Sequence, residues 1–301
     1  MIEVQEMTEL FRRNQTNCLR GLAALLIAIG HILIDWHAPR VVNITGSVGV
    51  AMFLVLSGYG INESYKKNGL NKYWTKKIKR IIIPYFLFIT TLIPFANDFS
   101  LKDYLLDITF IDSSFWYVSF LMKCYVFYWI VQRFFPDKFF ILFLIGGLIS
   151  LNFLMQMEAE QSFSFFAGAC ISKYRDDIQT IEKKKILLFA LYCFLFGFFF
   201  LMLKEIPAVH AYKGTKLYNY ILLCIKLPIC TPLLLLPTII PIIEKSKFLY
   251  ICGICSFELY LVHLFLLRYL DKSFQGLILY ITATAILTMA FYKINKMIQR
   301  L

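Results

Sequence analysis

The chain has 301 residues, of which 59% are hydrophobic, 17% aromatic and 17% charged. Soluble domains are about half apolar and about a quarter charged, so this composition excludes an ordinary water-soluble fold. The formal net charge of +12 could indicate nucleic-acid binding. The Lys and Arg residues, however, lie mostly between apolar runs, which is typical of a protein oriented in a membrane.

Apolar runs along the chain are long enough for membrane helices, which need about 20 mostly apolar residues. They predict an all-α integral membrane protein of about ten transmembrane helices, forming a single domain over residues 1–301 with a cytoplasmic segment at 1–18. The predicted helices cover residues 19–36, 47–64, 78–96, 115–135, 138–156, 161–173, 186–203, 217–243, 248–270 and 275–297.

Two of these runs differ from an uninterrupted span. The run at 161–173 is short, and whether it fully crosses the membrane is left open. The run at 217–243 contains four prolines, which predict kinks or a break because proline removes a hydrogen bond of the helix. These prolines are Pro228, Pro232, Pro237 and Pro241.

The positions of Lys and Arg predict the orientation of the helices. With the N-terminus inside, the cytoplasmic loops hold 21 Lys and Arg residues and the opposite loops hold seven. Cytoplasmic loops carry the excess of positive charge, so both termini are predicted to be cytoplasmic. We expect no cleavable signal peptide, because the first apolar run lacks a small-residue cleavage site.

The eight cysteines lie almost entirely within apolar runs. Cys252 and Cys255 form a CxxC pair, but His and other polar neighbours that would complete a zinc or redox site are missing around them. We therefore interpret the cysteines as small apolar side chains, and we expect no metal site.

The first predicted helix carries ionisable side chains, which cost about 2.5–3.5 kcal/mol at a helix centre and are therefore functional candidates. Arg20 lies at its cytoplasmic end and His31 follows eleven residues later. Eleven residues are about three turns and about 16 Å, so both side chains share one face. Asp35, one turn beyond His31, could hold one imidazole nitrogen and leave the other as a general base. The alternative is a hydrogen-bonded interfacial His31 and an Arg20 that only reaches the membrane surface.

Small and basic residues mark the cytoplasmic ends of the next two predicted helices. The SGYG segment at 57–60 includes Ser57 and Tyr59, and its small residues would let a ligand or a neighbouring helix approach closely. A cationic cluster opens the third helix and predicts either contact with anionic lipids or a phosphate clamp. This cluster consists of Lys76, Lys77, Lys79 and Arg80.

Polar residues also lie in the fourth and ninth predicted helices. Trp116, near the start of the fourth, is most simply part of an interfacial aromatic belt. In the ninth, Ser256, Tyr260 and His263 fall at i, i+4 and i+7 on one stripe. Glu258 is an intramembrane acid on another side of that helix. A core stripe predicts apolar residues at this spacing, so these residues are further site candidates.

Five segments together resemble one known family. RGLAALLIAIGH, GVAMFLVLSGYGI, KKIKRIIIPY, FWYVSFLM and SFELYLVHLF, in this order and spacing, are similar to motifs of the acyltransferase family 3 of bacterial membrane O-acyltransferases. The resemblance spans nearly the whole chain. It implies a ten-helix domain in the bacterial inner membrane, which transfers acyl groups, most often acetyl from acetyl-CoA, to cell-surface sugars or other envelope acceptors. Acyl-CoA is then a co-substrate, and no bound cofactor is implied.

The resemblance also implies roles for individual residues. Arg20 would bind the acyl donor and His31 would be the essential catalytic residue. The family's basic pair falls on Lys77 and Arg80; the family usually has Arg at both places, so Lys77 is a departure. Ser57 and Tyr59 match the second-helix motif and are counted with the donor-binding residues. Tyr260 and His263 match the ninth-helix motif.

Other classes of function fit the sequence less well. A transporter or flippase for a lipid-linked sugar or small metabolite would suit Arg20, Glu258 and His263 and the proline-rich eighth helix, but no inverted repeat is visible. A sensor or scaffold gives no reason for these side chains within spans. The unrelated membrane-bound O-acyltransferase superfamily is expected to carry its catalytic His in a later span.

Overall fold

The computed structural model describes residues 11–95, 99–110 and 113–300. The protein is 84% helical, and the described residues contain no strand, which confirms the all-α prediction. Residues 1–10 of the predicted cytoplasmic segment, and residue 96 at the end of the third predicted helix, lie outside the described residues.

Six helices in the described part of the chain are long and apolar enough to cross a membrane. A bent pair, α15 (Lys247–Ile254) and α16 (Ser256–Leu267), makes a seventh if its two helices are one span; the bend is 79°. The six candidate spans contain α1 (Arg13–Asp35), α2 (Ile44–Asn68), α7 (Phe139–Phe153), α11 (Lys183–Glu205), α13 (Lys216–Leu234) and α17 (Phe274–Ile298).

The other predicted spans are shorter, interrupted or less apolar. The run at 78–96 begins as a π-helix, η2 (Ile78–Ile82), and continues as α4 (Ile83–Leu92) and a short 3-10 turn. α6 (Trp116–Phe134) has 19 residues, which is long enough for a span, but it includes the polar residues Lys123, Gln132 and Arg133. α9 (Ser164–Lys173) has ten residues, fewer than a perpendicular span needs. The remaining elements are η1 (Arg40–Asn43), α3 (Tyr73–Lys77), η3 (Ile93–Phe95), α5 (Leu101–Thr109), η4 (Pro136–Lys138), α8 (Gln156–Ala159), α10 (Arg175–Gln179), α12 (Pro207–His210), α14 (Leu236–Ile239) and η5 (Pro241–Lys245).

The proline-rich run at 217–243 does break, but later than its first prolines. α13 continues through Pro228 and Pro232 and ends at Leu234. The short helix α14 follows, with Pro237 in its first turn, and η5 then begins at Pro241. Proline is tolerated in the first turn of a helix, where its missing N–H would have no partner.

The chain divides into two compact units. The first comprises the residues up to Gly69 together with Phe135–Gly253, and the second comprises Leu70–Phe134 together with Ile254–Leu301. Each unit is described by itself below.

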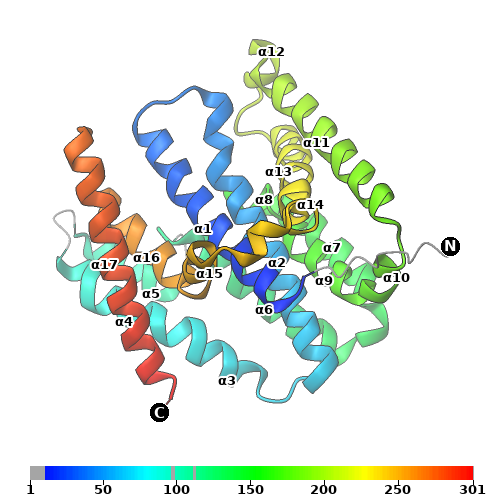
Figure 1. Cartoon of the computed structure of the whole chain (residues 1–301), viewed down its shortest axis with the longest axis horizontal. Coiled ribbons are helices and arrows are strands. Elements are labelled where there is room, and N and C mark those ends of the chain that lie inside the picture. Colours follow the sequence, from blue (N-terminus) through cyan, green and yellow to red (C-terminus); the bar gives the residue numbers. More distant parts are fainter. Residues whose placement is uncertain (1–10, 96–98, 111–112, 301) are drawn as a thin grey trace. The chain divides into compact units, whose positions relative to one another are not determined.

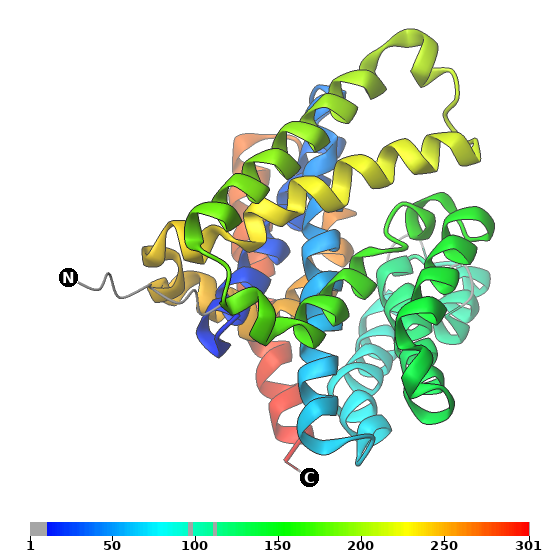
Figure 2. The ribbon, with the colours of Figure 1, turned by 90° about the vertical axis from the view of Figure 1, so that its right-hand side faces the viewer.

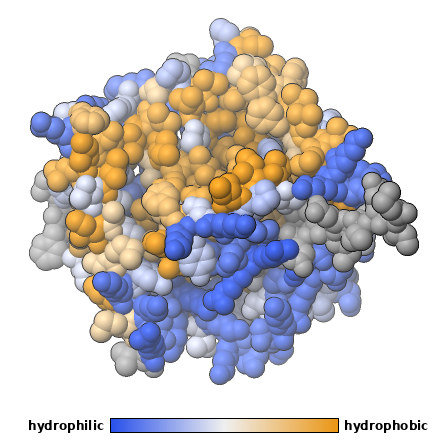
Figure 3. Space-filling model, viewed as in Figure 1, coloured by the Kyte–Doolittle hydropathy of each residue, from blue (hydrophilic) through white to orange (hydrophobic). Residues whose placement is uncertain are grey.

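Helix α2 lies at the centre of the first unit, packed against α1, α9 and α13. Most of its residues between 46 and 62 are buried, as expected for a helix that is apolar on all sides. Figures 1 and 2 show α11 and α13 side by side in this unit. Figure 3 shows apolar side chains gathered over this pair, and much of α11 is exposed and apolar. An apolar surface of this kind requires a lipid environment.

Two glycines allow α2 and α9 to cross in backbone contact. A Cβ atom on Gly58 would overlap the Phe165 carbonyl, and one on Gly168 would overlap the Val55 carbonyl. We therefore expect Gly58→Ala to lower the thermal stability of the detergent-solubilised protein, because overpacking typically costs about 1–3 kcal/mol.

Gly60→Ala is the matched control for that substitution. A Cβ atom on Gly60 would meet only the flexible Arg20 guanidinium, at 3.4 Å. Alanine should be tolerated here, since it favours the helix over glycine by about 1 kcal/mol. Melting curves followed by fluorescence size-exclusion chromatography check both variants, and equal melting temperatures would contradict the packing argument.

The second unit has an aromatic core around Phe88 of α4. The Phe88 ring lies 5.6 Å from Phe291 of α17 and 6.1 Å from Phe265 of α16, in each case edge to face. Phe115 approaches the same ring at 5.9 Å. This geometry is favourable for aromatic pairs and fixes α4, α16 and α17 around one buried ring.

Candidate active site

Arg20 and His31 both contact α2 in the first unit. They lie on the uninterrupted helix α1, so they are separated by about 16 Å along its axis. The Arg20 Nη2 atom lies 3.4 Å from the position that a Cβ atom on Gly60 would take. The His31 Cδ2 atom lies 3.7 Å from the equivalent position on Gly46. The basic group and the imidazole therefore lie along opposite ends of α2.

A close helix crossing fixes His31 against α2. A Cβ atom on Gly30 would overlap the backbone of Gly46, so the two helices meet here without intervening side chains. His31 follows Gly30 directly, which leaves its half-buried ring beside the start of α2. The backbone packing thus fixes the point on α1 from which the imidazole extends. The role of His31 as a general base stays a prediction.

Asp35 is the last residue of α1 and is half-buried like His31. Four residues separate the two on one helix, which places them on neighbouring positions of the same face. The orienting role of Asp35 remains a prediction.

The segment at 57–60 takes part in helix packing, and the donor-binding role of Ser57 and Tyr59 stays a prediction. Tyr59 is buried, and its ring lies 4.9 Å from that of Phe11. Gly58 meets α9, and Ser57 is half-buried. Within this segment it is the open position at Gly60 that adjoins a predicted site residue, Arg20.

A buried ion pair also lies in the first unit. Lys226 of α13 contacts the Glu160 carboxylate through its Nζ atom, and both side chains are almost fully buried, at 5% and 7% exposed. Beside it, Gln161 donates from Nε2 to the Ser47 carbonyl at 2.8 Å. Ser47 directly follows Gly46, the residue that His31 contacts. The ion-pair segment and His31 therefore approach consecutive residues of α2.

The sequence interpretation missed Lys226, although a signal for it was present. Lys226 is a lone cation in the apolar run YILLCIKLPIC, and intramembrane charges are functional candidates by default. Its partner Glu160 lies between the predicted helices at 138–156 and 161–173, and hydropathy alone gives no sign that this carboxylate is buried.

In the second unit, Lys77 lies against aromatic rings. Its Nζ atom is 3.9 Å from the ring centroid of Tyr125 and 5.7 Å from that of Tyr73. The Tyr73 hydroxyl donates to the Tyr125 carbonyl at 2.7 Å and fixes this arrangement. Cation–π contact holds the ammonium group in place. Arg80 is exposed and lies in the π-helix η2, a helix type frequently found at functional sites.

The ninth-helix candidates are buried within the second unit. His263 is fully buried, and its Nδ1 atom lies 2.8 Å from the Leu259 carbonyl. The Tyr260 ring lies 5.8 Å from that of His263 and 5.2 Å from that of Tyr117. These aromatic contacts form part of the core of the second unit.

Glu258, Ser256 and Trp116 complete the predicted set in this unit. Glu258 accepts a hydrogen bond from Asn295 Nδ2 of α17 at 2.9 Å. Ser256 is buried at the start of α16, and Trp116 is half-buried at the start of α6. The carboxylate of Glu258 thus connects α16 and α17.

A second missed residue, Asp107 of α5, is also buried in the second unit. Its Oδ1 atom accepts hydrogen bonds from the Ser113 hydroxyl and the Ser114 N–H, both at 2.8 Å. The Tyr85 hydroxyl donates to the Asp107 carbonyl at 3.0 Å. Burial raises the pKa of the Asp107 carboxyl, and these two hydrogen bonds to Oδ1 offset the increase only in part.

This raised pKa predicts that Asp107→Asn stabilises the protein at neutral and alkaline pH. The folded state holds the proton more tightly than the unfolded state, so stability falls as pH rises above the usual Asp pKa of about 3.9. Asparagine keeps the Oδ1 acceptor without the charge. Melting temperatures should therefore favour the variant at about pH 8, by a margin that shrinks as the pH falls toward about 4. A constant difference between the two proteins across this range would contradict the assignment.

No group of three or more His, Cys, Asp or Glu side chains in the described residues is arranged to hold a metal ion.

Comparison with known families identifies the class of protein. The sequence matches the model of the Acyl_transf_3 family, an acyltransferase domain, over residues 13–292. Together with the apolar helices, this defines a multi-pass membrane protein of an acyltransferase family. The chain belongs to the acyltransferase 3 family. Comparisons with curated proteins and with solved structures gave no match.

Proposed function

We propose that the protein is an O-acetyltransferase of the bacterial inner membrane, which moves acetyl from acetyl-CoA to a hydroxyl of a cell-surface polysaccharide or another envelope glycan. Membership of an acyltransferase family supports the reaction class. The observation that carries the assignment of residues is the placement of Arg20 and His31 on α1, each against a glycine of α2.

The proposed topology has ten membrane segments with both termini in the cytoplasm. The excess of Lys and Arg in the loops on one side supports this orientation. The six candidate spans and the bent pair would supply seven segments, and α4 with its flanking turns, α6 and α9 would supply the others. In this orientation Arg20 lies toward the cytoplasm and His31 toward the outer face.

The proposed reaction is a direct transfer. His31 takes the proton from the acceptor hydroxyl as that oxygen attacks the thioester carbonyl. The C–S bond then breaks, and the CoA thiolate receives the proton from the imidazolium, so an ester and free CoA are formed. Asp35 would orient the imidazole, and no enzyme nucleophile is required.

Arg20 has the proposed role of binding phosphate groups of the donor, as do Arg80 and Lys77. Arginine suits this role because its guanidinium donates two parallel hydrogen bonds to phosphate oxygens. We expect Arg20→Gln to raise the KM for acetyl-CoA about tenfold, the effect of about 1.4 kcal/mol, with a smaller change in kcat. An unchanged KM would remove this role from Arg20.

Consumption of the donor tests the proposal against a transporter. The purified protein in nanodiscs is given acetyl-CoA and a crude envelope glycan, and free CoA is followed with a thiol reagent. An acetyltransferase releases CoA in step with the appearance of acetylated glycan. Uptake or movement of a sugar without release of CoA would favour the transporter function instead.

A further inference from the structure

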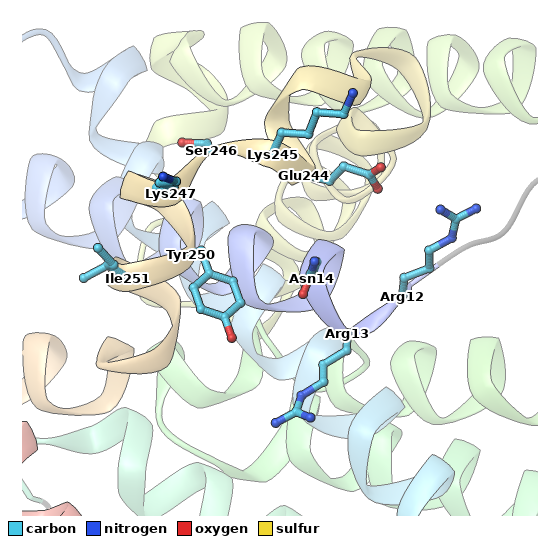
Figure 4. A pocket seen from close by; sticks show the side chains of 9 residues that line it. All are labelled: Arg12, Arg13, Asn14, Glu244, Lys245, Ser246, Lys247, Tyr250 and Ile251. Carbon is cyan, nitrogen blue, oxygen red and sulfur yellow. The ribbon is translucent and has the colours of Figure 1, made fainter.

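A basic pocket lies at the N-terminal end of α1 in the first unit. It has a volume of about 800 Å³ and is formed by the start of α1, the end of η5 and the first turn of α15. We call this cavity the basic pocket, and Figure 4 shows the side chains that line it. The six that the argument uses are Arg12, Arg13, Glu244, Lys245, Lys247 and Tyr250. Small-molecule sites commonly have volumes of about 300–1,000 Å³, so the basic pocket has room for a ligand of this kind.

The charge of the basic pocket favours an anion. Four of its side chains are cationic, and Glu244 is its acid. The Glu244 carboxylate accepts a hydrogen bond from Gln15 Nε2 at 2.9 Å, which directs one oxygen toward α1. Lys245 and Lys247, on either side of Ser246, are exposed. Arg and Lys side chains that line a pocket bind phosphate groups through charge-assisted hydrogen bonds.

The basic pocket continues the row of predicted site residues on α1. Arg13 precedes Arg20 by seven residues, which is about two turns, and precedes His31 by 18 residues, which is about five turns. The three side chains therefore share one face of α1, with Arg13 about 27 Å from His31 along the axis. An elongated ligand with phosphates at one end could extend from the pocket along this face.

We infer that the basic pocket binds the 3′-phosphorylated ADP end of the acyl-CoA donor. This inference rests on the proposed function and adds the subsite that anchors the nucleotide. Arg12, Arg13, Lys245 and Lys247 contact its 3′-phosphate, and Arg20 keeps its proposed contact with the diphosphate, about 10 Å further along α1. In the proposed orientation the pocket opens toward the cytoplasm, where acyl-CoA is present.

Tyr250 favours a nucleotide over the headgroup of an anionic lipid, which presents the same phosphate chemistry. In Figure 4 the Tyr250 ring and the Arg13 side chain extend in the same direction from the pocket. An aromatic ring provides a stacking surface for a base, whereas a lipid headgroup has no ring to stack on it.

Binding of CoA to the full chain in zwitterionic nanodiscs tests the inference, because these contain no anionic lipid. Isothermal titration with CoA and with dephospho-CoA compares wild type with the double variant K245Q/K247Q. We expect CoA to bind the variant at least about tenfold more weakly, because two charge-assisted contacts are lost. The preference of wild type for CoA over dephospho-CoA should fall toward one. The control K183Q/K184Q removes two cations, one half-buried and one exposed, from the start of α11, outside the pocket, and should bind CoA like wild type.

The outcomes distinguish the inference from the proposed function. Wild type that binds CoA, with K245Q/K247Q binding it equally well, overturns the pocket assignment alone. Equal weakening in both double variants also overturns it, since the effect would then be nonspecific charge. If K245Q/K247Q binds CoA like wild type but loses phosphatidylglycerol that co-purifies with wild type, the pocket binds lipid and the inference is overturned.

Transfer from S-acetylpantetheine, which lacks the nucleotide, should be equal in wild type and K245Q/K247Q. Absence of transfer from either donor by wild type would instead contradict the proposed function.

Discussion

His31→Ala should lower kcat for acetyl transfer by about 10²–10⁴-fold, the range that general acid–base catalysis contributes. The imidazole is the proposed base, and alanine leaves the acceptor hydroxyl without a group to take its proton. The packing at this point depends on Gly30 and Gly46 rather than on the imidazole, so the variant should still fold. Steady-state release of CoA by purified protein measures the effect.

Two variants separate a catalytic role of His31 from a general effect. His37→Asn changes another histidine, which is exposed and has a positive φ of 55° that asparagine tolerates, so its rate should match wild type. Arg20→Gln should act mainly on KM, as proposed above. A His31→Ala protein that melts like wild type and keeps its full kcat would exclude His31 as the base.

Lys226→Met should greatly reduce the amount of folded protein, the second large effect. Removal of one partner of a buried ion pair typically costs about 3–5 kcal/mol, because the other charge stays buried without compensation. Here the Glu160 carboxylate would be left in that state, with only 7% of its side chain exposed. Fluorescence size-exclusion chromatography of solubilised membranes gives the yield and the melting temperature.

The double variant Lys226→Met with Glu160→Gln should recover most of the folded protein, since neither side chain then carries a charge. Lys185→Met is the control: its ion pair with Glu182 is largely exposed, with side chains 68% and 50% accessible, and is worth at most about 1 kcal/mol. If Lys226→Met melts like wild type, the pair is not needed for folding. If the double variant folds but transfers no acetyl, the pair also contributes to the proposed site beside Gly46 of α2.

Hydropathy predicted the long membrane helices because their apolar residues are continuous. The run at 275–297 corresponds to α17 to within one residue at each end, and the run at 186–203 corresponds to α11, which extends further into Lys and Glu residues at both ends. The run at 19–36 begins six residues after the start of α1 for the same reason, since the helix continues through Arg13 to Cys18. A helix can continue into polar residues, so hydropathy predicted the presence of these helices more accurately than the residues at which they begin and end.

Tertiary contacts determined what hydropathy could not show. The run at 248–270 contains no proline, yet α15 ends at Ile254. Its Gly253 lies so close to Asn17 of α1 that a Cβ atom would overlap the Asn17 carbonyl. Such a contact between distant residues leaves no periodic signal in the sequence. The prolines of the run at 217–243, by contrast, predicted its break.

The candidate site could be predicted where a single helix carries it. The spacing of Arg20 and His31 needs only an uninterrupted α1 to put them on one face. The pairing of Lys226 with Glu160 and the burial of Asp107 depend on segments that meet only in the fold. The structure buries the ninth-helix stripe of Ser256, Tyr260 and His263, and its role in the site stays a prediction.

The most direct test of the account is the transfer of radiolabelled acetyl from acetyl-CoA into envelope glycan by membranes that contain wild type or His31→Ala. We expect wild type to give labelled glycan, from which mild base releases labelled acetate, and His31→Ala to give at most about one hundredth as much. Equal labelling by both proteins at equal amounts of folded protein would contradict it.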